Sequence, residues 1–132
     1  MNLELEINGQ IYQFRASFGF LRELNAQVKT HIDAINADEK MGMQLCFTKL
    51  LDGDVEALAN VLDLLNKNQT PRLKMTDLEQ YIAEDADIDD LFKKVIDFLS
   101  EANVSKKVMQ RVLDAAKEAE ALKKAQMKAS KK

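Results

Sequence analysis

The residues of this 132-residue chain whose spacing most suggests chemistry are three alternating aspartates, Asp85, Asp87 and Asp89. Alternating carboxylates open calcium-binding loops, because their oxygens can converge on one hard cation. The rest of such a loop does not follow here, since Asp90 stands where a glycine turn is needed and Ile96 where a bidentate glutamate is needed. We interpret the cluster as a helix start, where the macrodipole favours negative charge, and we predict no metal site.

Candidate nucleophiles and general bases are sparse. His31 is the only histidine, which excludes zinc sites built from several histidines, and a single cysteine, Cys46, excludes an intramolecular disulfide. Cys46 lies at helical spacing from Met43, Phe47 and Leu50, which favours a buried hydrophobic residue over a nucleophile. The chain has only four glycines and no glycine-rich phosphate loop. We therefore predict that it is not an enzyme, has no catalytic residues and needs no cofactor.

Charge is divided unevenly along the chain. Nine basic and three acidic residues give residues 103–132 a net charge of +6, which leaves −9 for residues 1–102 because the whole chain carries −3. An acidic body argues against nucleic-acid binding, which needs clustered Lys and Arg. The basic tail has no aromatic residue for base stacking, and its mixture of Lys, Ala and Glu is typical of a solvated helix.

Membrane and export signals are also missing from the sequence. No run approaches the roughly eighteen apolar residues of a membrane span. The N-terminus carries Glu4 and Glu6 where a secretory signal would be basic and then apolar. We expect a cytoplasmic protein whose partners include no nucleic acid and no membrane.

The elements that must position any functional surface begin with a β-hairpin around Asn8 and Gly9. Both residues tolerate the positive φ of a two-residue type I′ turn, and the flanking segments alternate between apolar and polar residues. A two-residue loop fixes the register of the two strands and predicts one nearly apolar face. The predicted pairs are Leu3 with Phe14, Leu5 with Tyr12, Ile7 with Gln10, Glu4 with Gln13 and Glu6 with Ile11. Because an isolated hairpin is marginal in water, that face needs a cover. The nearest candidate is the helix that follows its predicted cap, Ser17.

Amphipathic helices fill the remaining chain. Apolar residues at helical spacing form their stripes, namely Phe20, Leu24, Val28 and Ile32; Met43, Cys46, Phe47 and Leu50; Val55, Leu58, Ala59, Leu62 and Leu65; and Ile88, Leu91, Phe92, Val95, Leu99 and Ala102. The predicted N-caps of the later helices are Asp38, Asp54, Asp87 and Ser105, with a capping box over Thr76–Glu79, while Gly53 ends the second helix. A polar run over residues 66–71 reads as a linker.

These elements define the predicted fold class, which is mainly α (α+β): an N-terminal β-hairpin packed on a bundle of five or six helices. We predict a β-hairpin plus helical domain over residues 1–102 and a basic C-terminal helix with a frayed end over residues 103–132.

The first thirty residues carry a family resemblance. A strand ending Ile7-Asn8-Gly9, a second strand with Tyr12 and Phe14, and the sequence from Phe18 to Asn25 resemble the tail assembly chaperones of long-tailed phages and prophages of Gram-positive hosts. The resemblance implies a protein that binds the tape measure protein before tail tube subunits polymerise around it. It also implies that the tail tube protein is a further partner and that the chain is absent from the mature virion. Self-association is expected, because such a chaperone must coat a long polymer.

The partner-binding face predicted from these considerations lies on the last helix. It comprises Val108, Met109, Val112, Leu113 and Ala116, which share one side of that helix next to a basic flank. Two alternatives share the same composition, a small helical adaptor or regulator and a minor tail structural protein.

Overall fold

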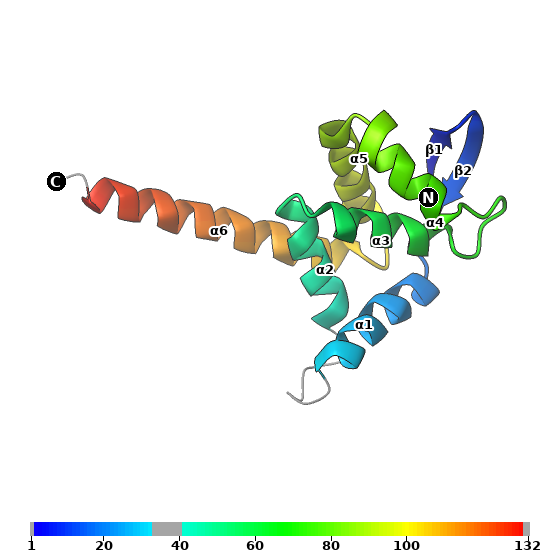
Figure 1. Ribbon diagram of the computed structural model, residues 1–132. Helices are drawn as coiled ribbons and strands as arrows, with labels where there is room; N and C mark the ends of the chain where they lie inside the picture. Colours follow the sequence, from blue (N-terminus) through cyan, green and yellow to red (C-terminus); the bar gives the residue numbers. More distant parts are fainter. Residues whose placement is uncertain (1, 33–40, 131–132) are drawn as a thin grey trace.

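A computed structural model describes residues 2–32 and 41–130, and Figure 1 shows it as a compact body with one long helix extending from it. The strands are β1 (Leu3–Ile7) and β2 (Gln10–Phe14), and the helices are α1 (Phe18–Ile32), α2 (Met41–Leu51), α3 (Val55–Asn66), α4 (Met75–Gln80), the π-helical turn η2 (Tyr81–Asp85), α5 (Ile88–Glu101) and α6 (Lys106–Ser130). Six α-helices and a two-stranded antiparallel sheet within the described residues confirm the predicted mainly α (α+β) class. In the same part of the chain, no helix combines the length and hydrophobicity needed to cross a membrane.

The hairpin forms in the predicted register. Asn8 and Gly9 have φ values of 55° and 79°, and every predicted cross-strand pair is present. Leu5, Ile7 and Phe14 on its apolar face are buried. Turn chemistry therefore predicted the register of this hairpin correctly.

The end of α3 is hydrogen-bonded to the backbone at and just after β2, while Phe20 and Leu24 of α1 share one core with the apolar face of the hairpin. The Arg15 backbone N–H donates to the Leu65 carbonyl at 2.9 Å, and the Asn66 side-chain amide donates to the Gln13 carbonyl at 2.9 Å. Figure 1 shows α1 leading away from the hairpin below α3. The end of α3 can bind the backbone here because β2 has no second neighbouring strand.

The Asn66 side chain makes four hydrogen bonds at this junction. It is fully buried, and its Nδ2 donates to the carbonyls of Gln13 and Pro71, at 2.9 and 3.2 Å. Its Oδ1 accepts from the Leu73 N–H at 2.6 Å and from Arg72 Nη1 at 3.1 Å. The residue that opens the predicted linker therefore ties β2, α3 and the following loop together.

Several predicted helix ends are confirmed. Gly53, at φ 80°, closes α2: its N–H donates to the Leu50 carbonyl and the Asp54 N–H to the Lys49 carbonyl, both at 3.1 Å, which is a Schellman arrangement. The Asp54 carboxylate then accepts from the first turn of α3. Ser17 Oγ accepts from the α1 backbone at Phe20, and Asp87 accepts from the α5 backbone at Asp90. The predicted cap Asp38 and the side chains of Val28 and Ile32 lie outside the residues described in detail.

Two predicted caps differ from the structure. The capping box at Thr76 is wrong, because α4 begins earlier, at Met75, with Lys74 at the N-cap position and no side-chain cap bond. This earlier start follows from Leu73, which is buried beside Asn66 and determines where the chain enters the helix. Ser105 does precede α6, but its buried hydroxyl donates to the Leu99 carbonyl of α5 at 2.6 Å.

One hydrophobic core joins the hairpin, helices α1 to α5 and the first turns of α6. Helices α1 and α2 approach so closely at Gly42 that an added Cβ there would lie 2.1 Å from the Leu24 carbonyl oxygen. Asn25 Oδ1 accepts from the Met43 N–H at 3.1 Å across the same joint.

The division into residues 1–102 and 103–132, and the frayed end, stay predictions.

Candidate functional site

The predicted partner-binding face of α6 is partly engaged inside the protein. Met109 and Val112 are buried against the core, and Val108 and Leu113 pack on it while remaining partly accessible. Ala116, one turn further, is exposed. A charge at Val112 would enter the core, so only the outer residues of this face are open to a partner. Partner binding by the face itself stays a prediction.

Beyond this root, by which we mean residues 106–114, α6 continues as an arm, which we define as residues 115–130 and whose side chains from 115 to 126 are exposed. Figure 1 shows the arm projecting from the body, and a helix of sixteen residues spans roughly 24 Å at about 1.5 Å per residue. Leu122 is 65% exposed in the middle of the arm. The arm carries four Lys and two Glu, and Lys131 and Lys132 follow it in the sequence. It is therefore a basic helix with an unpartnered apolar side chain.

A second accessible surface is a groove of about 780 Å³ between α3, α4, η2 and the start of α5. Its lining, which we call the groove residues, consists of Val55, Glu56, Ala59, Asn60, Met75, Glu79, Ile82, Ala83, Ala86 and Ile88. Val55 is 48% exposed and Met75 37% exposed, although both are apolar. The groove thus presents apolar surface that the core does not cover.

The π-helical turn η2 forms one wall of this groove. The Ala86 N–H donates to the Tyr81 carbonyl at 2.8 Å, five residues earlier, so the helix that began as α4 widens here. Such turns occur frequently at functional sites. The widened turn places Ile82 and Ala83 opposite the first turns of α3.

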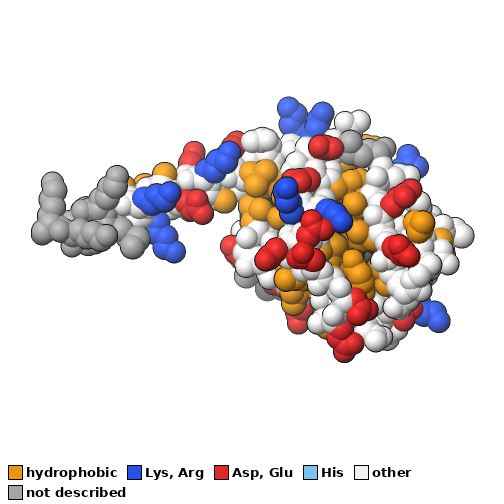
Figure 2. Space-filling view, turned by 90° about the horizontal axis from the view of Figure 1, so that it is seen from above, with side chains coloured by type: hydrophobic (Ala, Val, Ile, Leu, Met, Phe, Trp, Pro, Cys, Tyr) orange, Lys and Arg blue, Asp and Glu red, His pale blue; other side chains and the backbone are white. Residues whose placement is uncertain are grey.

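Acidic residues border the groove. Glu56 and Glu79 belong to its lining and are exposed, and among the described residues neither is part of an ion pair with a basic side chain. The segment from Met75 to Phe92 contains seven acidic residues and no basic one. Figure 2 shows one face of the body, where apolar side chains reach the surface among both acidic and basic ones. The groove is suited to a ligand that is both apolar and basic.

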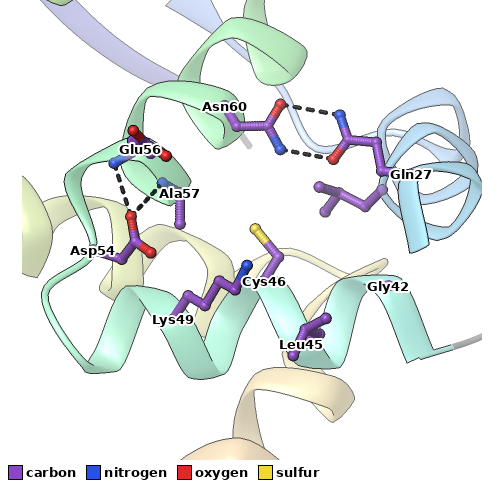
Figure 3. A pocket seen from close by; sticks show the side chains of 10 residues that line it. Gln27, Gly42, Leu45, Cys46, Lys49, Asp54, Glu56, Ala57 and Asn60 are labelled. Carbon is purple, nitrogen blue, oxygen red and sulfur yellow. Dashed lines mark hydrogen bonds between the residues drawn. The ribbon is translucent and has the colours of Figure 1, made fainter. Parts of the chain in front are cut away.

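A smaller hollow of about 470 Å³ lies between α1, α2 and α3. Figure 3 shows Cys46 and Lys49 of α2 facing it, with the side chains of Gln27 and Asn60 joined across it by two hydrogen bonds of 3.0 and 2.8 Å. Burial raises the pKa of the Cys46 thiol to about 11, an effect that outweighs the nearby Lys49 charge. A thiol that stays protonated is a poor nucleophile. No cluster of three or more potential metal ligands occurs within the described residues.

Sequence reasoning did not identify the groove. Val55 and Ala59 were assigned to the core stripe of α3, whereas both line the groove instead. The signal that could have separated them was the width of that stripe, since Leu58, Leu62 and Leu65 already suffice to bury one side of α3.

Comparison with known proteins gives one match. The family model described as phage tail assembly chaperone protein, TAC, matches residues 4–114. No curated protein and no solved structure gives a significant match. Because the matched residues make up most of the chain, the chain belongs to this family of phage tail assembly chaperones. The match includes the hairpin, the groove and the root of α6, and it ends where the arm begins.

Proposed function

We propose that this tail assembly chaperone binds the tape measure protein in the host cytoplasm and assists assembly of the tail tube around it. It acts by covering apolar surface, makes and breaks no covalent bond, and is absent from the mature virion. The tail tube protein is its second partner, recruited when the tape measure protein is ready to be enclosed.

The observation that carries this proposal is the root of α6. Its inner residues, Met109 and Val112, anchor the helix in the core, so its outer residues are presented in a fixed position. Val108 and Leu113 in the root, and Ala116 at the start of the arm, are accessible to different degrees. A helix held in this way can contact an apolar stripe of a long helical partner, because amphipathic helices bury such stripes against each other.

Co-expression with the tape measure protein encoded by the neighbouring gene tests the proposal. The measurement is the fraction of tape measure protein that remains soluble and co-purifies with the chain. We expect the wild-type chain to solubilise it and Ala116→Glu to abolish both effects, since a charge at an exposed position disrupts the contact without entering the core. Ala121→Glu is the matched control, because Ala121 is equally part of α6 and exposed but lies on another side of the helix.

The outcomes separate the alternatives. A tape measure protein that stays insoluble with the wild-type chain would favour an adaptor or regulator of another process. Mass spectrometry of purified virions tests the other alternative, a minor tail structural protein. Such a protein would be recovered in stoichiometric amounts, whereas a chaperone would be missing. Equal loss of binding in Ala116→Glu and Ala121→Glu would show that the predicted face is not the contact.

A further inference from the structure

We propose that the groove binds a basic, amphipathic helix of the tape measure protein, as a second contact separate from the outer residues of α6. This inference rests on the proposed function, because it takes the tape measure protein as the partner. It goes beyond that function by assigning a further binding surface and by stating the chemistry of the segment that this surface holds.

Two helical walls give the groove a shape that a third helix fits. Val55 and Ala59 are four residues apart on α3, and Met75, Glu79 and Ala83 follow one another at four-residue intervals on α4 and η2. Side chains four residues apart form ridges along a helix, and a neighbouring helix packs its own side chains between such ridges. The small Ala59 and Ala83 let that helix approach closely, and the exposed Val55 and Met75 side chains gain a cover.

The backbone of the walls also favours a helix over an extended segment. None of the groove residues lies in a strand, and Ala86, which links η2 to α5, already donates its N–H to the Tyr81 carbonyl at 2.8 Å. An extended segment would find no strand edge to pair with its own amide and carbonyl groups, and such groups are costly to bury unpaired. A helix bonds these groups internally and presents only side chains to a groove.

Charge determines which helix the groove accepts. Glu56 stands on the α3 wall and Glu79 on the α4 wall, and among the described residues neither forms an ion pair. Lys74 precedes α4 but is not one of the groove residues. A helix with Lys or Arg along both edges of its apolar stripe pairs with the two carboxylates, whereas an acidic helix is repelled. The segment held by the groove is therefore basic.

The groove and the outer residues of α6 belong to different helices, so they act as two separate contacts with one long partner. The groove lies on α3, α4, η2 and α5, whereas Val108 and Leu113 belong to α6. Once one contact has formed, the other becomes intramolecular, which raises the overall affinity. Loss of the groove contact therefore weakens the complex with the tape measure protein without abolishing it.

A model peptide tests the chemistry of the groove on the purified chain. The probe is a fluorescently labelled helix of about five turns, with leucines on one side and lysines on the other, and a matched peptide has glutamates in place of the lysines. We expect fluorescence anisotropy to show binding of the lysine peptide alone. The groove variant, Glu56→Lys with Glu79→Lys, should bind it about tenfold more weakly, since attraction becomes repulsion at two positions.

The control for this variant is Glu118→Lys with Glu120→Lys. These two residues are exposed on the arm, and their substitution changes the net charge of the chain by the same amount. The control should bind the lysine peptide as the wild-type chain does. Equal binding of the two peptides, or equal binding of the lysine peptide by the groove variant and the control, would overturn the proposal.

The shape of the groove is tested separately from its charge. Ala83→Gln adds bulk to one wall at an exposed position, without a new charge and with little change in helix propensity. It should weaken binding of the lysine peptide by about threefold or more, because the peptide loses close contact with that wall. Ala121→Gln, exposed on the arm, is the matched control and should have no effect. Equal binding by these two variants would place the peptide outside the groove and refute the proposal.

Co-expression with the tape measure protein identifies the occupant. We expect the groove variant to co-purify about threefold less tape measure protein than the Glu118→Lys, Glu120→Lys control, with a difference that narrows as salt screens the charges. A photoreactive group attached to Ala83→Cys should crosslink to a basic, amphipathic segment of the tape measure protein. The natural Cys46 is buried, so it does not compete for the label.

The results distinguish this inference from the proposed function. If the tape measure protein stays insoluble even with the wild-type chain, both proposals fail. If the wild-type chain and the groove variant retain it equally, the proposed function stands and the groove contact is refuted. A crosslink to the tail tube protein, to another copy of the chain or to an acidic segment of the tape measure protein would show a different occupant and would also refute it.

Discussion

The joint between α1 and α2 makes the sharpest prediction about the fold. Gly42 lies where the two helix backbones meet, and a Cβ added there would be 2.1 Å from the Leu24 carbonyl oxygen and 2.5 Å from the Asn25 Cα. Carbon and oxygen atoms pack without overlap at about 3.3 Å or more. The substitution Gly42→Ala therefore requires α2 to move by about 1 Å relative to α1, which would also lengthen the hydrogen bond between Asn25 and the Met43 N–H.

The expected loss of unfolding free energy depends on which atoms block the new methyl group. Inserting a methyl group into a well-packed core typically costs about 1–3 kcal/mol, and the upper end applies here because backbone atoms cannot change rotamer. Alanine regains up to about 1 kcal/mol through its better helix propensity. We expect Gly42→Ala to lower the free energy of unfolding by about 2 kcal/mol, a large share of the total for a domain of this size.

Urea denaturation followed by circular dichroism measures this loss. Gly19→Ala is the matched control, since Gly19 is also helical but an added Cβ would find its nearest neighbour, Ser17 Oγ, at an ordinary 3.5 Å. Only the better helix propensity of alanine then changes the free energy of unfolding. The control should therefore be as stable as the wild-type chain or slightly more stable. If Gly42→Ala and Gly19→Ala unfold at the same urea concentration, the close approach of α1 and α2 is refuted.

Two further predictions concern buried polar and titratable groups. Replacing Asn66 with Ala should lower the free energy of unfolding by about 2–4 kcal/mol, because several buried groups lose their hydrogen-bond partner. The control Asn60→Ala, in an accessible amide pair, should lower it by less than about 1 kcal/mol. Equal losses of stability in thermal unfolding would contradict this prediction. Burial raises the pKa of Cys46 from 9.0 to about 11, so the unfolded chain loses this proton first as pH rises. Stability should therefore fall between these two pH values by an amount on the order of 2 kcal/mol that Cys46→Ala lacks, and parallel pH profiles for the two proteins would disprove the shift.

The sequence predicted the elements whose determinants are local. The Asn8-Gly9 turn fixes the hairpin register because two adjacent residues supply the required backbone angles, and Gly53 with Asp54 ends one helix and begins the next in the same way. Such signals need no knowledge of the rest of the chain. The capping box at Thr76 failed because its spacing was present but the buried Leu73 moved the helix start.

Long-range contacts could not be predicted from the sequence. Asn66 was assigned to a linker because polar residues surround it, and its role depends on Gln13, 53 residues away. The groove has the same cause, since it exists only because α4 and η2 fold back over α3. Periodicity shows that Val55 and Ala59 lie on an apolar side of a helix, but it does not show whether another element covers them.

Helix α6 carries the proposed function. Its first turns are fixed by the core through Met109 and Val112, so the direction of the arm is determined by the body of the same copy. The family match covers residues 4–114, so the first turns of α6, with the accessible Val108 and Leu113, lie within the part of the chain that the family model describes. The arm lies outside that match.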